Sequence, residues 1–195
     1  MDTFTILKFT HIIGFVLIFS GILGIFISEW QTFSTHDAKR FAEAARLTLI
    51  FRNSFIAPGS IIIIVTGIWL VLHLDMGFFE EPWLIGMWGL FAMEFVEANL
   101  VARRSNNNTV RWAQKALEAG EITEEIRSSA HGRLGLFTHF LDFPITLVMV
   151  YCGVGRPDWT GLIIGVVLAF LASAALALTA PKRYLRTSPN TGKPA

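Results

Sequence analysis

The sequence predicts an all-α membrane protein, a polytopic bundle of about five transmembrane helices, from three observations. Hydrophobic residues make up 53% of the chain, charged residues only 16%, and the mean hydropathy is +0.53. These values exceed those of a soluble domain whose surface contacts water. Apolar stretches of membrane-spanning length recur along the chain, and basic residues gather between particular stretches. We therefore expect one transmembrane domain over residues 1–181, a polar cytoplasmic tail over 182–195, and no nucleic-acid partner.

Five apolar stretches are the predicted spans. Each is close to the roughly 20 residues that a helix needs to cross the hydrocarbon core. The first stretch lacks a basic leader and a small-residue cleavage site, so we expect a retained helix and not a signal peptide. In chain order, the predicted spans are residues 5–27, 55–74, 83–101, 134–154 and 161–180.

The placement of Lys and Arg predicts the orientation of these spans. Cytoplasmic loops of membrane proteins carry an excess of positive charge. The connections after the first and third spans are rich in Lys and Arg, whereas the link around Glu80 and Glu81 and the short link around Arg156 are not. The N-terminus is therefore predicted outside, and the C-terminus in the cytoplasm.

Two cytoplasmic connections are predicted to hold short amphipathic helices. Residues 38–49 repeat apolar side chains at helical spacing, so this segment either lies along the membrane or extends the second span into the cytoplasm. Residues 109–119 have the same character, end before Gly120, and are followed by Thr123 as a helix N-cap. The asparagine run 106–108 is expected to form a polar turn.

Small residues at every fourth position mark one side of the fifth span. Such a ridge lets two helices approach closely. It is the predicted contact of a homo-oligomer, with packing against a helix of the same chain as the alternative. The ridge consists of Gly161, Gly165, Ala169, Ser173 and Ala177.

Polar residues at membrane depth are the candidates for function, because burying them is costly unless they pair, bind a ligand or line a path. His11 lies in the first span, about 9 Å below its outer end, and Gly14 on the same face is expected to leave space for a planar macrocycle. A neutral imidazole is a common axial ligand of haem iron. Lys8 would neutralise a propionate, and His73 is the natural second ligand. The alternative is that His11 only forms a hydrogen bond within the bundle.

A second polar group is predicted in the inner half of the membrane. Glu94 and Glu97 lie three residues apart on the third span, and His139 and Asp142 have the same spacing on the fourth. This spacing puts each pair on one helix face. Facing helices would then offer three carboxylates and an imidazole to a non-haem metal ion or to a proton path.

This inner group has alternatives of its own. Arg52 and Arg133 lie near the same surface and would equally neutralise the acids as a buried ion-pair network, together with Glu29 at the end of the first span. His139 lies about 13 Å below His11 across a core of roughly 30 Å. It would therefore ligate a second haem near the inner surface, join the carboxylates, or bind nothing.

The segment 8–14, with Lys8 followed three residues later by His11 and then by isoleucine, resembles the opening of the bacterial membrane-type protoporphyrinogen oxidase and its relatives. That superfamily includes copper-resistance-type membrane proteins and an uncharacterised integral membrane family. Residues 52–72 are similar to the second helix of the superfamily, and Trp83 opens the third span as it does there. The resemblance implies haem b held by His11 in a bacterial-type inner (cytoplasmic) membrane.

Two positions depart from the oxidase pattern. Met87 stands where the oxidase has a lysine, and Glu97 stands where a histidine of the third helix is expected. The resemblance is therefore nearest to the uncharacterised integral membrane relatives.

Three functions from different classes are compatible with these residues. The first is a haem b-binding oxidoreductase or electron-transfer protein with a quinone or porphyrin as its partner. The second is a metal-binding or ion- or proton-handling protein that uses the inner group. The third is a structural or assembly subunit whose polar residues only join helices.

Overall fold

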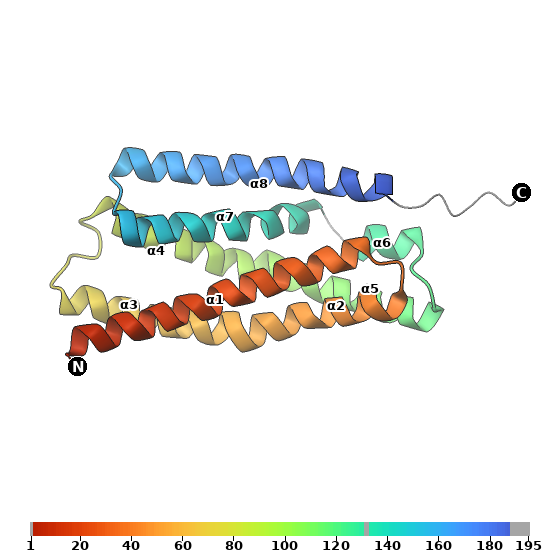
Figure 1. Cartoon of the computed structure of the whole chain (residues 1–195), viewed down its shortest axis with the longest axis horizontal. Coiled ribbons are helices and arrows are strands. Elements are labelled where there is room, and N and C mark those ends of the chain that lie inside the picture. Colours follow the sequence, from red (N-terminus) through yellow and green to blue (C-terminus); the bar gives the residue numbers. More distant parts are fainter. Residues whose placement is uncertain (1, 131–132, 188–195) are drawn as a thin grey trace, which may run out of the picture.

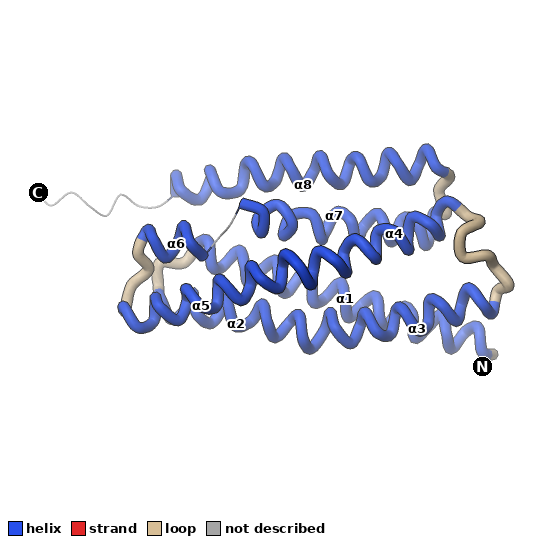
Figure 2. The backbone as a smooth tube through the Cα atoms, turned by 180° about the vertical axis from the view of Figure 1, so that it is seen from behind, coloured by secondary structure: helices blue, strands red, loops and turns tan. Residues whose placement is uncertain are grey.

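The computed structural model describes residues 2–130 and 133–187, and within these residues it contains helices, turns and loops but no strand (Figures 1 and 2). The predicted all-α fold class is therefore confirmed. The helices, two of them short π-helical segments labelled η, are α1 (Thr3–Ser34), α2 (Ala38–Phe51), η1 (Arg52–Ile56), α3 (Ala57–His73), α4 (Pro82–Glu97), η2 (Ala98–Ala102), α5 (Arg103–Ala119), α6 (Glu124–Ala130), α7 (Arg133–Gly155) and α8 (Trp159–Thr187).

Four of the described helical stretches are long and apolar enough to span a membrane. They are Thr3–Ser34, Ala38–His73, Pro82–Ala119 and Trp159–Leu178, and a shorter apolar helix covers Phe140–Gly155. This arrangement agrees with the predicted polytopic bundle. Helix α8 continues to Thr187, inside the segment that was predicted as a tail.

Several helices are longer than the membrane requires. The 32 residues of α1 measure about 48 Å at 1.5 Å per residue, against a hydrocarbon core of roughly 30 Å. Helix α2 runs through η1 into α3, and α4 runs through η2 into α5, without a loop. Residues 38–49 therefore extend the second span, as one of the two alternatives stated. The prediction of a turn at the asparagine run was wrong, because these residues lie inside α5.

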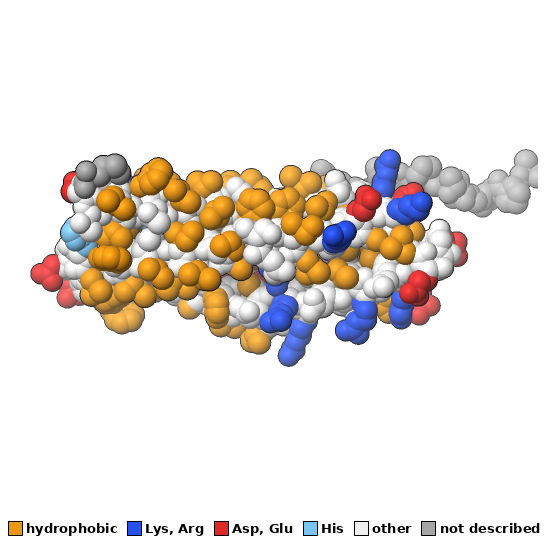
Figure 3. Space-filling view, turned by 90° about the horizontal axis from the view of Figure 1, so that it is seen from below, with side chains coloured by type: hydrophobic (Ala, Val, Ile, Leu, Met, Phe, Trp, Pro, Cys, Tyr) orange, Lys and Arg blue, Asp and Glu red, His pale blue; other side chains and the backbone are white. Residues whose placement is uncertain are grey.

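The extended helices build a small packed layer at the end of the bundle that carries α2, α5 and α6, which we call the inner end. Phe41 of α2 is almost completely buried there, against Ala113, Ala116 and Ile126. Arg127 of α6 donates hydrogen bonds of 2.8 and 2.9 Å to the backbone oxygens of residues 33 and 35, so it satisfies carbonyls at the end of α1. Lys and Arg side chains project from this half, whereas hydrophobic side chains cover the other half (Figure 3).

Within the membrane the helices form two groups. Helix α1 packs along α3, while α7 packs between α4 and α8 (Figure 1). Helices α1 and α3 approach closely because glycines face the partner helix: a Cβ at Gly59 would lie 2.8 Å from the backbone oxygen of Gly14. The two groups meet through aromatic rings, including Phe19 with Phe143 at 5.7 Å between centroids.

The small-residue ridge of α8 lies against α7. Ala169 and Ser173 are buried, and a Cβ at Gly165 would lie 3.5 Å from a methyl carbon of Val148. The ridge thus takes part in packing within one chain, which was the stated alternative, and a homo-oligomer through α8 stays a prediction. Buried Cys152 belongs to the same core.

Candidate functional site

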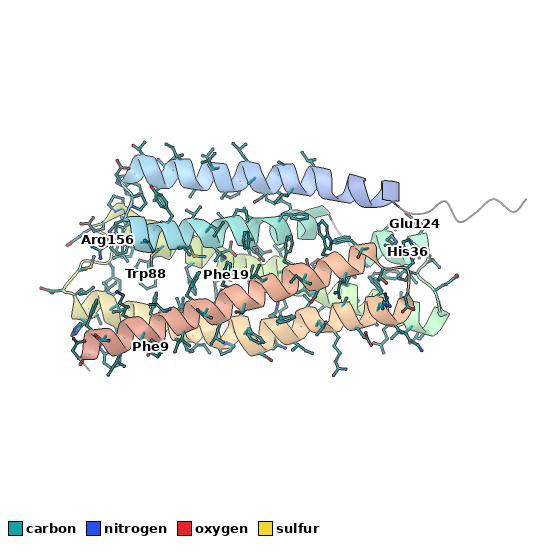
Figure 4. The ribbon with its side chains drawn as sticks, in the orientation of Figure 1. Phe9, Phe19, His36, Trp88, Glu124 and Arg156 are labelled. Atoms are coloured by element: carbon teal, nitrogen blue, oxygen red, sulfur yellow. The ribbon has the colours of Figure 1, made fainter. Side chains whose placement is uncertain are left out.

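The outer half of the bundle holds His11, which lies against α3. Its Nδ1 is 2.9 Å from the hydroxyl oxygen of Thr66, and its Cε1 would lie 3.3 Å from a Cβ at Gly67. Cη2 of Trp88, from α4, would lie 3.9 Å from the same Cβ at Gly67. Figure 4 shows Trp88 between the two helix groups. Side chains of α1 and α4 therefore both lie near Gly67 of α3.

The hydrogen bonds of Thr66 decide which nitrogen of His11 carries the proton. The Thr66 hydroxyl donates to the backbone oxygen of Ile62 at 2.6 Å, so it has no hydrogen left for His11 and must accept from Nδ1–H. In the neutral imidazole, Nε2 of His11 then keeps its lone pair. A histidine whose Nδ1–H is held in this way presents Nε2 to a ligand, a metal or a proton donor.

The other residues predicted around His11 do not gather beside it. Gly14 faces α3, where a Cβ would lie 2.8 Å from a side-chain carbon of Ile62, so the space expected for a macrocycle is filled. His73 is exposed and stacks on Phe4 with 6.3 Å between ring centroids. Phe4 precedes His11 by seven residues, about 10 Å along the helix. Lys8 is exposed. Haem binding by His11 stays a prediction, and His73 is not placed as its second ligand.

The inner half holds a network centred on Arg52, the first residue of η1. Its Nη1 donates 2.9 Å to the backbone oxygen of Ala98, the first residue of η2. In the amide orientation that satisfies its neighbours, Asn106 accepts from Nη2 of Arg52 at 3.2 Å and donates to Oε1 of Glu29 at 3.0 Å. Arg52 thereby connects the two π-helical segments and the end of α1.

Asn106 is a site residue that the sequence analysis missed. It is only 3% exposed, although Asn is mostly a surface residue. A signal was present, since Asn106 lies seven residues before Ala113 and thus on the same helical face as the buried alanines of α5.

Three predicted carboxyl groups lie beside this network. Asp142 of α7 interacts electrostatically with Glu94 and Glu97 of α4, with Glu29 of α1, and with Arg52. The i, i+3 spacing thus brought the pair on α4 to one side, as predicted. Pro144, which has no backbone N–H, lies inside α7 two residues after Asp142.

Several polar atoms of this cluster are buried but have no hydrogen-bond partner among the described residues. They are Oε1 of Glu94, Oδ1 of Asp142 and Nε of Arg52. Buried polar atoms in native proteins are almost always satisfied by protein or by ordered water. The combination of acceptors and a donor suits water molecules, which donate to carboxylates and accept from a guanidinium.

The described residues alone do not form a metal site. Among residues 2–130 and 133–187, no group of three His, Cys, Asp or Glu side chains is arranged to hold one. The guanidinium of Arg52 would also repel a cation. The predicted metal ligand His139 belongs to α7, but its side chain lies outside the described part of the structure, as does that of Arg133.

The two π-helical segments coincide with this cluster. Residues 52–56 and 98–102 are the described π-helices, and Arg52 ties the start of one to the start of the other. Single π-helical turns within α-helices occur frequently at functional sites. The inner cluster therefore combines buried charge, unsatisfied atoms and irregular backbone.

Comparison with known proteins gives one match. Residues 5–157 match the family described as "Predicted integral membrane protein (DUF2269)". No curated protein and no solved structure matches the chain. The match overturns the resemblance to protoporphyrinogen oxidases and copper-resistance-type proteins, because the matching family is a different one. Haem b binding therefore has no support from family resemblance.

Proposed function

The chain belongs to the DUF2269 family of predicted integral membrane proteins, and on this premise we propose that it is a proton-handling membrane protein whose working groups are Glu94 and Asp142. The observation that carries the proposal is that a carboxyl oxygen of each residue is buried in the bundle without a hydrogen-bond donor among the described residues. A proton and a bridging water supply what these atoms lack.

The electrostatic surroundings favour protons over other ligands. Carboxyl groups on α4 and α1 repel Asp142, and Arg52 attracts it. Like charges held close together in a low dielectric do not all remain ionised. A bound proton relieves this repulsion without the three or more ligands that a metal ion needs.

The position of the cluster also fits proton transfer. Glu29 and Asn106 connect it toward the inner end, where the surface is basic and polar. Intramembrane acids commonly serve as proton relays. We place this activity in a bacterial-type cytoplasmic membrane, with the inner end facing the cytoplasm, on the basis of the excess of Lys and Arg at that end.

Infrared spectroscopy of the protein in lipid nanodiscs tests whether the proton is present. We expect a carbonyl band of a protonated carboxylic acid at neutral pH in the wild type, and its loss or marked reduction in Asp142→Asn. Glu43→Gln is the matched control, because Glu43 is exposed on α2 and lies outside the cluster. A wild-type spectrum without this band, or a band that persists in both Asp142→Asn and Glu94→Gln, contradicts the proposal.

Proton movement is tested in liposomes that contain a trapped pH-sensitive dye. With a pH gradient imposed and the membrane potential clamped by valinomycin and potassium, we expect wild-type protein to dissipate the gradient faster than empty liposomes. Asp142→Asn should fall to the rate of empty liposomes, while Glu43→Gln should match the wild type. Equal rates for wild type and Asp142→Asn count against a transfer role.

A further inference from the structure

Arg52 lies beside the acids of the inner cluster, yet two of its nitrogens donate to neutral oxygens. Nη1 donates to the backbone oxygen of Ala98 at 2.9 Å, and Nη2 donates to the amide oxygen of Asn106 at 3.2 Å. Nε is buried and has no hydrogen-bond partner among the described residues. Arg52 therefore attracts the neighbouring carboxyl groups through its charge, while these two hydrogen bonds hold its guanidinium toward Ala98 and Asn106.

The side chain of Asn106 is fixed in the orientation that serves Arg52. Its amide nitrogen donates to the backbone oxygen of Ala102 at 3.2 Å and to Oε1 of Glu29 at 3.0 Å. An amide nitrogen carries two hydrogens, so both are used and the amide oxygen is left to face Nη2 of Arg52. Asn106 is only 3% exposed, so bulk water has little access to these bonds.

From this geometry we infer that Asn106 is a positioning residue of the proposed proton site: it keeps Arg52 from pairing directly with Asp142, and so sets how tightly the cluster holds its proton. The inference rests on the proposed function. A guanidinium that donates two hydrogen bonds to a carboxylate stabilises the ionised form of that carboxylate. Because Arg52 donates to Ala98 and Asn106, it reduces the repulsion among the acids without taking the place of the proton.

Charged groups from four helices act on Arg52 and belong to the same balance. Acids on α1, α4 and α7 attract it, and the guanidinium of Arg103 at the start of α5 repels it. Asn106 is neutral, so it holds Arg52 without adding a charge to the cluster. The acids that act on Arg52 are Glu29, Glu97 and Asp142, and Glu94 acts on Asp142 in turn, while the side chains of His139 and Arg133 on α7 lie outside the described part of the structure.

A pH titration of the carboxylic acid band tests this role, with the full chain in lipid nanodiscs and infrared detection. Asn106→Leu keeps the branching at Cγ but offers no acceptor to Nη2, so Arg52 should turn toward the acids and favour their ionised forms. We expect the pH at which the band is half lost to fall by about one unit relative to the wild type, which is a tenfold lower affinity for the proton.

Two further variants separate positioning from packing. Asn106→Asp keeps an acceptor for Nη2 and holds Arg52 more firmly, so its band should be half lost at a pH no lower than that of the wild type. A merely structural role would let water into the cluster in both variants and lower this pH in both. Asn107→Leu is the matched control, because Asn107 is the next residue of α5 but is exposed, and it should titrate as the wild type does.

The outcomes distinguish this inference from the proposed function. A wild-type band that titrates identically in Asn106→Leu overturns the inference alone, and so does a fall shared by Asn106→Leu with Asn106→Asp or with Asn107→Leu. If Asn106→Leu does not fold, Asn106→Asp decides, since a half-loss at lower pH than in the wild type contradicts positioning of Arg52. A wild type without the band overturns the proposed function, and the inference with it.

Discussion

The outer and inner polar sites differ in how their buried polar groups are stabilised. At the outer site, one neutral imidazole is held by a single hydrogen bond to Thr66, and the remaining polar atoms are few. At the inner site, carboxyl groups from three helices surround one guanidinium. A neutral site loses one interaction when it is altered, whereas an alteration of a charged site unbalances every group that remains.

The largest effect is expected at the charged centre. Arg52→Ala removes the donor to Ala98 and Asn106 and leaves the neighbouring acids without their attraction, so we expect a loss of about 3 kcal/mol or more in the free energy of unfolding. SDS-driven unfolding in mixed micelles, followed by circular dichroism, measures this loss. Arg46→Ala is the control, because Arg46 is exposed on α2. Similar stability of the two variants would show that Arg52 does not hold the cluster.

A second substitution tests the close helix contact that positions the outer site. Gly59→Ala places a methyl group 2.8 Å from the Gly14 oxygen and 3.0 Å from the Ile18 nitrogen, both of them backbone atoms. This contact should push α1 away from α3, lower the free energy of unfolding by about 2 kcal/mol and lengthen the hydrogen bond from His11 to Thr66. Gly89→Ala on α4 meets nothing within 4 Å and should leave stability nearly unchanged in the same unfolding assay.

A smaller loss is expected from Thr66→Val, which removes the acceptor of His11 Nδ1–H but preserves the shape of the side chain. We expect the free energy of unfolding to fall by about 1 kcal/mol. The ring ¹⁵N chemical shifts of His11 should also change, because the proton is no longer held on Nδ1. The other histidines serve as internal references in the same NMR spectrum. Unchanged shifts would mean that Thr66 does not set the tautomer.

The smallest effect concerns Asp37, the N-cap of α2. A hydrogen bond from the backbone N–H of Arg40 lowers the pKa of Asp37 below its ordinary value. Such a group stabilises the fold above its unfolded-state pKa, and this contribution is lost as the pH falls through the lower folded-state pKa. The melting temperature of Asp37→Asn should therefore fall less than that of the wild type when the pH is lowered below about 4. Identical pH profiles for the variant and the wild type would contradict this linkage.

The fold was largely predictable from local properties of the sequence. Apolar length identified the spans, and helical spacing at residues 38–49 predicted a helix there, although it did not distinguish a helix along the membrane from an extension of the second span. The sequence analysis did not predict the π-helical segments or the hydrogen bond that joins Arg52 to Ala98, because these residues lie 46 positions apart and no local spacing pairs them. The asparagine run was misassigned to a turn, because the low helix propensity of Asn is outweighed there by the burial of Asn106 and by the hydrogen bond from Asn108 to the backbone oxygen of Ser129.

The candidate sites were predictable only in part. The acids at positions 94, 97 and 142 were found because their spacing is local, but nothing local pairs His11 with Thr66 across 55 residues. One indirect signal existed, since Thr66 follows Gly59 by seven residues and so shares its helical face. The space expected for a macrocycle beside Gly14 is not present, because α3 packs there. A glycine in a membrane helix can serve close helix packing as well as ligand binding.

The two π-helical segments also set the rotational phase of the helices that cross the inner boundary. A π-helical turn accommodates one residue more than an α-helical turn, so the helix beyond it is out of phase by about 100°. Helices α2 and α3 are parts of one unbroken helix joined by η1. Because of the phase change at η1, one side of α3 can face α1 while the side of α2 that carries Phe41 faces α5 and α6. Deleting a single residue within 52–56 would therefore rotate the whole inner layer relative to the membrane half.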